Sequence, residues 1–205
     1  LQTYLDGILD VRGVEARYIG PTLEPGADIW GVRRKAQSFG AGEYDEIITY
    51  PLAKVKTPAD LEKHAWPTTE WFDYTALDDS IRRVQQDGAG NERCLMIHNG
   101  NIFESAWYMR GFERMLMDFI DAPELVHALF ERVTTFYCAH FRRLLEAADG
   151  RVDLAFTADD IGGQNGLLFS LGAWETFLKP YHQRLNRVVH EFGVKVIYHT
   201  DGAVM

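Results

Sequence analysis

The stretch "VKVIYHTDG" at residues 194–202 decides how this chain folds. It begins as a largely apolar run, typical of a buried strand, and ends in His199, Asp201 and a glycine. Two earlier stretches follow the same plan, because "RCLMIHNG" (93–100) and "VDLAFTADD" (152–160) also pass from apolar to polar residues. The chain therefore contains three predicted strands that each end in side chains able to bind or react.

Long helical patterns separate these strands, at 102–120, 121–150 and 174–192. Strands that alternate with long helices predict βα units around a parallel sheet. Polar groups at the carboxyl ends of the strands are typical of a (β/α)8 TIM barrel, although an open doubly wound sheet places its ligands similarly. The chain has neither a G-x-G-x-x-G turn after a strand nor a P-loop. We therefore predict the α/β class and a TIM barrel.

The predicted barrel is incomplete. A closed barrel takes ~250 residues, whereas this chain has 205 residues and shows only about four βα units. We expect residues 1–205 to form one partial barrel domain. Residues 1–13 are predicted to be the end of a helix and residues 14–21 a short strand. A glycine-rich, β-prone pattern around 26–69 predicts a hairpin-like insertion.

Composition and charge exclude several classes of partner. The net charge is −9 and the isoelectric point is about 5.2, which disfavours binding to nucleic acid. No apolar run approaches the ~20 residues that cross a bilayer, and residues 1–30 do not show the charged start and apolar stretch of a signal sequence. Cys94 and Cys138 fall on different predicted elements without metal-ligand spacing, as expected for reduced thiols. We expect a cytoplasmic protein without a membrane or nucleic-acid partner.

Asp159 and Asp160 end one strand, and adjacent residues of a strand point to opposite faces. At most one of them enters the mouth of the barrel, where a carboxylate can accept hydrogen bonds from a substrate or stabilise developing positive charge. Gln164, on the loop 161–166, could assist it. The alternative is a purely structural strand end that caps this loop.

His199 and Asp201 are two residues apart and would face the same side of a continuing strand. They could bind a metal together, orient each other as base and carboxylate, or bind a polar substrate. A hydrogen-bonded histidine at a strand end is the alternative. A metal site needs at least one more ligand, and the sequence offers none at motif spacing.

Asn99 and Gly100 follow the first of the three strands, and Tyr108 lies one or two turns into the next predicted helix. A tyrosine there can donate a hydrogen bond into the cleft, or it can simply pack with its hydroxyl at the rim. Five other polar side chains on the predicted helices are expected at the surface or its edge: Glu104, Arg110, Glu113, His182 and His190.

The stretch from Phe156 to Gly202, "FTADDIGGQNGLLFSLGAWETFLKPYHQRLNRVVHEFGVKVIYHTDG", resembles the core of the uroporphyrinogen decarboxylase superfamily. That superfamily includes the heme-pathway decarboxylase and the cobamide-dependent methyltransferases that act on methanol, methylamines and coenzyme M. The resemblance rests on F-x-K-P-Y at 177–181 and on a final strand ending in D-G. It implies a (β/α)8 barrel and, in many members, a tetrapyrrole-related substrate or partner. It also implies that Tyr108 stands at a substrate-contacting position and that Asp159 or Asp160 lies near the substrate.

The chain departs from both branches of the superfamily. The decarboxylase segments F-S-D-I and R-Q-A-G-R have no clear equivalent here. The methyltransferases bind zinc through H-x-C and a later cysteine, whereas this chain has His199-Thr200-Asp201. A carboxylate in place of a thiolate is a harder ligand, and a poorer one for a zinc ion that activates thiols.

The resemblance leaves three functions open. The first is a carboxy-lyase of porphyrin biosynthesis that decarboxylates a porphyrinogen without a cofactor. The second is methyl transfer that uses a corrinoid partner and a zinc ion held by His199 and Asp201. The third is a barrel that binds a tetrapyrrole without turnover. A homodimer is compatible with each. The candidate residues are the catalytic set Tyr108, Asp159, Asp160, His199 and Asp201, and the substrate-binding set Asn99, Gly100 and Gln164.

Overall fold

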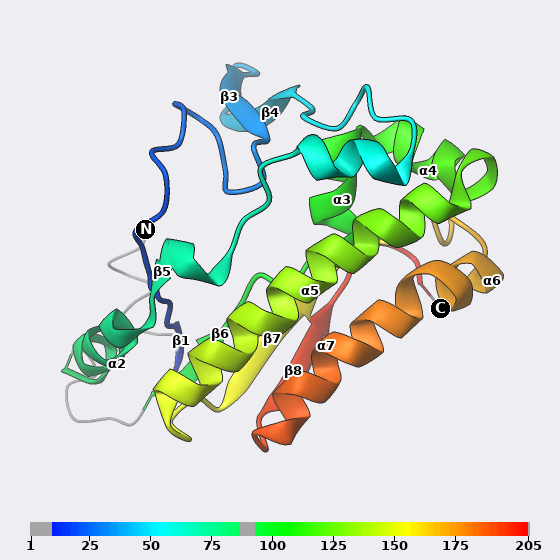
Figure 1. Ribbon diagram of the computed structural model, residues 1–205. Coiled ribbons are helices and arrows are strands. Elements are labelled where there is room, and N and C mark those ends of the chain that lie inside the picture. The colour runs from blue at the N-terminus through cyan, green and yellow to red at the C-terminus, as the bar shows by residue number, and fades with distance from the viewer. Residues whose placement is uncertain (1–9, 87–92, 205) are drawn as a thin grey trace.

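The computed structural model describes residues 10–86 and 93–204, and its centre is a parallel sheet (Figure 1). The four strands are hydrogen-bonded in the order β1-β6-β7-β8, and every pair is parallel. Their bounds are β1 Val11–Gly13, β6 Cys94–Ile97, β7 Leu154–Ala158 and β8 Lys195–His199. The predicted parallel sheet is therefore confirmed, and the carboxyl ends of all four strands meet at one edge.

The long helices pack against one face of this sheet, and Figure 1 shows α5 and α7 side by side across it. Ile97 and Ala155 point toward these helices and are fully buried, as is Phe130 of α5. Apolar side chains on the helices complete this core. The helices are α2 Leu77–Gln86, α3 Ile102–Arg110, α4 Phe112–Asp121, α5 Pro123–Ala148, the short α6 Leu171–Ala173 and α7 Lys179–Glu191.

The opposite face of the sheet carries alternate residues of the same strands. Phe156 is half-buried there, and Ile197 is 42% exposed. Because successive side chains of a strand point to opposite faces, this second face is the one that the interior of a barrel would use.

The segment between β1 and β6 contains a second, smaller unit. Strands β3 and β4 form an antiparallel hairpin that stands apart from the parallel sheet in Figure 1. Strands β2 and β5 pair as a short antiparallel ribbon. The bounds are β2 Arg17–Tyr18, β3 Arg33–Ser38, β4 Glu43–Thr49 and β5 Phe72–Asp73. Short 3-10 helices link them: η1 Pro58–Lys63, η2 Thr69–Trp71 and η3 Tyr74–Ala76.

Several predicted boundaries are wrong. The predicted helix over 1–13 falls largely on residues 1–9, outside the described residues, and its last three residues form strand β1. Only Arg17 and Tyr18 of the predicted strand 14–21 are extended in a sheet. The predicted helix 102–120 is two helices, because Gly111 adopts a φ of +95° that only glycine takes readily.

The helix predicted from Trp174 begins with a π-helical turn, η4, at Trp174–Leu178, before α7 starts at Lys179. Pro180 lies in the first turn of α7, directly after η4, so the regular α-helix begins one residue before the proline.

Candidate functional site

Asp160, His199 and Asp201 form a cluster at the carboxyl ends of β7 and β8. One ligand atom from each of the three residues lies within 4.8 Å of the others. The His199 Nε2 atom is 3.3 Å from Oδ1 of Asp201 and 3.9 Å from Oδ1 of Asp160. The side chains are partly open to solvent, so a ligand could reach them. The structure thus adds Asp160 as a third group to the predicted pair.

Two loops bring the cluster together, and backbone contacts hold them in place. The Asp201 amide donates to Oδ1 of Asp160 over 2.8 Å, and the Ile161 amide donates to the Thr200 hydroxyl. A Cβ on Gly202, where φ is +89°, would lie 2.4 Å from the backbone of Gly162. Only glycine permits such a close approach, so packing accounts for the D-G pair at this position.

Asp159 points the other way and is fully buried. Its carboxylate accepts hydrogen bonds from the amides of Ile102 and Glu104, at 3.1 and 2.8 Å. It also lies 2.6 Å from the His182 ring. Asp159 therefore caps the amino end of α3 and joins it to α7. Of the two adjacent aspartates, Asp160 lies in the cluster at the carboxyl edge of the sheet, and Asp159 points into the core.

Tyr108 lies on α3 and donates a hydrogen bond of 2.8 Å to Oε1 of Glu104. Burial raises the pKa of the Glu104 carboxyl, and the charges of Asp159 and Asp160 raise it further, while hydrogen bonds from Tyr108 and Asn101 act in the opposite direction. Burial also raises the pKa of the Tyr108 hydroxyl, and the negative charge of Asp160 raises this pKa further. Tyr108 and Glu104 therefore lie within electrostatic reach of Asp160.

The β3–β4 hairpin contributes Arg34 to this region. Its guanidinium group lies 4.8 Å from the centre of the Tyr108 ring and forms an ion pair of 2.7 Å with Asp28. A cation over an aromatic face is a favourable contact. The segment between β1 and β6 thus covers one face of the Tyr108 ring.

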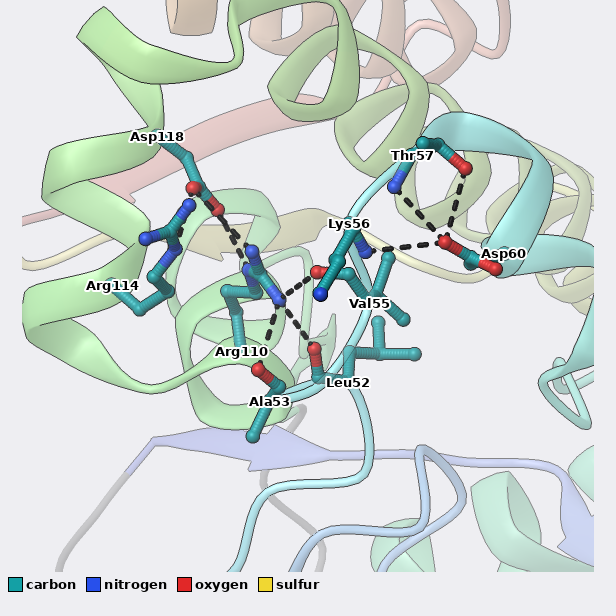
Figure 2. A network of polar contacts seen from close by, with 9 residues as sticks. All are labelled: Leu52, Ala53, Val55, Lys56, Thr57, Asp60, Arg110, Arg114 and Asp118. Atoms are coloured by element: carbon teal, nitrogen blue, oxygen red, sulfur yellow. Dashed lines mark hydrogen bonds and ion pairs between the residues drawn. The ribbon is translucent and has the colours of Figure 1, made fainter.

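A buried arginine anchors the chain that follows the hairpin (Figure 2). Arg110 Nη1 donates to the carbonyls of Leu52, Ala53 and Val55, at 2.7, 3.2 and 2.7 Å. Its Nε donates to Asp118 at 2.7 Å, and both side chains are 2% exposed. Arg110 therefore ties this segment to the corner between α3 and α4.

The three residues predicted to bind substrate lie in different surroundings. Asn99 is exposed, with a φ of +81°, and lines a groove of about 730 Å³ beside the carboxyl ends of β1 and β6. Gly100 is buried, and a Cβ there would lie 2.8 Å from the Thr157 side chain, so packing accounts for this glycine. Gln164 is exposed on the loop after β7.

Three of the five side chains expected at the surface are buried instead, so those predictions are wrong. Glu104 and Arg110 face the interior because Asn101, Tyr108 and Asp118 supply their polar partners. His182 is buried because Asp159 pairs with it. The two that remain exposed, as expected, are Glu113 and His190.

Both cysteines lie away from the cluster and are free thiols. Cys94 begins β6, at the edge opposite the cluster, and Cys138 lies within α5. Among residues 10–86 and 93–204, no helix is both long and apolar enough to cross a membrane.

A parallel sheet covered by helices, with its polar groups gathered at the carboxyl edge, defines part of a (β/α) barrel. Consistent with that class, the sequence profile of the uroporphyrinogen decarboxylase (URO-D) family matches residues 43–205. The chain belongs to the uroporphyrinogen decarboxylase family, which confirms the resemblance seen in its sequence.

Among solved structures, the chain is similar to a methyltransferase from Methanosarcina mazei, with a TM-score of 0.58 and 15% sequence identity. The match covers 98% of this chain and 54% of the methyltransferase, so the chain spans about half the length of that protein. At this identity the likeness concerns the fold. A comparison with curated proteins gives no match.

Proposed function

We propose that the protein is an enzyme that transfers a methyl group, with a corrinoid as its methyl-carrying partner and a zinc ion bound by Asp160, His199 and Asp201. The observation that carries this proposal is the approach of three ligand atoms to within 4.8 Å of one another at the carboxyl edge of the sheet. It favours methyl transfer over decarboxylation because a decarboxylase of this family needs no metal.

The donor set of the cluster fits a divalent cation. One imidazole nitrogen and two carboxylate oxygens are ligands that zinc accepts, and three protein ligands leave a coordination position open for a substrate. Two carboxylates also balance the charge of a dication. Unlike the H-x-C set, this donor set contains no sulfur. A cation held by it should therefore bind a substrate through oxygen or nitrogen more readily than a zinc ion held by thiolates would.

Backbone contacts around the cluster fix the two loops that carry it, which supports the proposal. The Asp201 amide fixes one oxygen of Asp160, and the Thr200 hydroxyl accepts from the Ile161 amide. His199 would bind the cation through a ring nitrogen. When bound there, the cation supplies Lewis acidity to the atom that gives or accepts the methyl group. Tyr108 and Asn99 contribute polar contacts to the substrate.

Decarboxylation is the second candidate, and the position of Asp160 favours it. A carboxylate at the mouth of the barrel can stabilise the cation that forms when a substrate pyrrole is protonated. Asp201 could assist from the adjacent strand. In this reaction the cluster would act without a metal. The third candidate is tetrapyrrole binding without turnover. The ligand would bind at the same edge of the sheet, but no reaction would follow.

One set of assays on the full-length protein separates the three functions. The first assay follows loss of the methyl group from methylcobalamin in the presence of a small amine or alcohol acceptor, with and without a chelator. The second follows loss of carbon dioxide from uroporphyrinogen. Methyl transfer that the chelator and His199→Ala both abolish supports the proposal. Chelator-resistant decarboxylation, or porphyrin binding with neither reaction, would contradict it.

A further inference from the structure

Glu104, on helix α3, is held by two hydrogen bonds of its side chain and one of its backbone amide. Its Oε1 accepts from the Tyr108 hydroxyl at 2.8 Å, and its Oε2 accepts from Asn101 Nδ2 at 2.6 Å. Its backbone amide donates to Oδ1 of Asp159 at 2.8 Å. The residue is 8% exposed, so these contacts replace water. Both carboxylate oxygens are therefore hydrogen-bonded, as a buried carboxylate requires, and their orientation is fixed.

Hydrogen-bond chemistry then fixes the role of Tyr108. An amide NH2 group can only donate, so Oε2 of Glu104 acts as an acceptor from Asn101. A tyrosine hydroxyl has one proton, and here Oε1 takes it. Once that proton is committed, the hydroxyl oxygen has only lone pairs left for a ligand.

The surrounding charges reinforce this polarity. Asp160 acts electrostatically on both Glu104 and Tyr108, and Tyr198 feels the charges of all three nearby carboxylates. The positive group that faces Tyr108 is Arg34, which is already paired with Asp28. A ligand that donates a hydrogen bond is favoured in such surroundings, and a ligand carboxylate is repelled.

We infer that Glu104 is a positioning residue that holds the Tyr108 hydroxyl as a hydrogen-bond acceptor, so that the ligand presents an N–H or O–H group to Tyr108 and not a carboxylate. The inference deepens the proposed function and rests on it only in placing the ligand at the same site. It reverses the donor role that the sequence suggests for this tyrosine.

The test uses pyrrole and N-methylpyrrole, which have the same ring and differ by a single N–H donor. Their dissociation constants for the full-length protein are measured by ligand-observed NMR. We expect pyrrole to bind about five-fold more tightly, as one net hydrogen bond provides. In Glu104→Gln the new amide can donate to the tyrosine oxygen, so the preference for pyrrole should disappear. In Tyr108→Phe it should disappear as well.

Glu113→Gln is the matched control, because Glu113 is an exposed carboxylate on the neighbouring helix α4. It should keep the wild-type preference. Equal binding of the two probes to the wild type, or an undiminished preference in a folded Glu104→Gln protein, would overturn the inference. Zinc content is measured in the same samples. A preference for pyrrole that persists in protein unable to bind zinc would support the role of Glu104 while contradicting the metal site.

Discussion

The Nε2 atom of His182 lies 2.6 Å from Oδ2 of Asp159, in a buried junction between α7 and the end of β7. Asp159 is 0% exposed and also accepts two amides at the start of α3. The next residue, Asp160, faces the opposite way and belongs to the cluster with His199 and Asp201. Two neighbouring aspartates thus lie in separate surroundings, one in the buried core and one in the cluster for which we propose ligand binding.

This separation can be measured with two isosteric variants. Asp159→Asn should lower the free energy of unfolding by at least about 2 kcal/mol. The reason is that the NH2 group of the new amide would face N–H groups that now donate to the carboxylate. Asp160→Asn should change it by less than about 1 kcal/mol, because its side chain is partly exposed. Urea unfolding followed by circular dichroism measures both. Equal losses from the two variants would contradict the assignment.

Asp118 offers a second matched pair, because two arginines bind the same carboxylate. Arg110 is 2% exposed and also donates to three carbonyls, whereas Arg114 is 51% exposed and is bound to Asp118 over 2.8 Å. Arg110→Met should cost about 3 kcal/mol of stability, since it leaves a buried carboxylate without its buried partner. Arg114→Met should cost less than about 1 kcal/mol. A similar cost for both would show that burial does not set the strength of this network.

His140 predicts a pH dependence of stability. Burial lowers the pKa of His140 from 6.5 to about 4. The Nδ1 atom of its ring forms a hydrogen bond of 2.7 Å with the Tyr74 hydroxyl. Because the unfolded chain binds a proton at higher pH than the folded protein, stability is complete above pH 6.5 and is lost as the pH falls toward 4. The loss should approach roughly 3 kcal/mol.

The control for this prediction is His140→Phe, which keeps an aromatic ring beside Phe136. Its free energy of unfolding should lack the part of the pH dependence that His140 causes. Unfolding curves recorded between pH 4 and pH 7 measure the difference. Parallel pH profiles for wild type and variant would show that His140 does not titrate in this way.

The parallel sheet could be predicted from the sequence because β6, β7 and β8 are apolar runs separated by long amphipathic helices. Local patterns of this kind report burial directly. Strand β1 was predicted as helix, since three residues are too few to show a period of two. The break at Gly111 was missed because its positive φ depends on how α3 and α4 pack, which local spacing does not show.

The candidate site could be predicted only in part. His199 and Asp201 were predicted to lie together on a continuing strand, but β8 ends at His199, and Asp201 approaches the His199 ring from the loop that follows. Which of Asp159 and Asp160 enters the mouth depends on His182, which lies 23 residues further along the chain. The burial of Glu104 likewise depends on Asn101 and Tyr108 closing around it. A charged residue three positions after a helix cap and four before a tyrosine is the signal that could have indicated it.

The most direct test of the central claim is the zinc affinity of the full-length protein, measured by isothermal titration after treatment with a chelator. We predict one zinc ion per chain and a loss of at least about ten-fold in affinity for each of Asp160→Asn, His199→Ala and Asp201→Asn. His190→Asn, which alters an exposed histidine outside the cluster, should bind zinc like the wild type. Failure of the wild type to bind zinc, or unchanged affinity in the three cluster variants, would contradict the account.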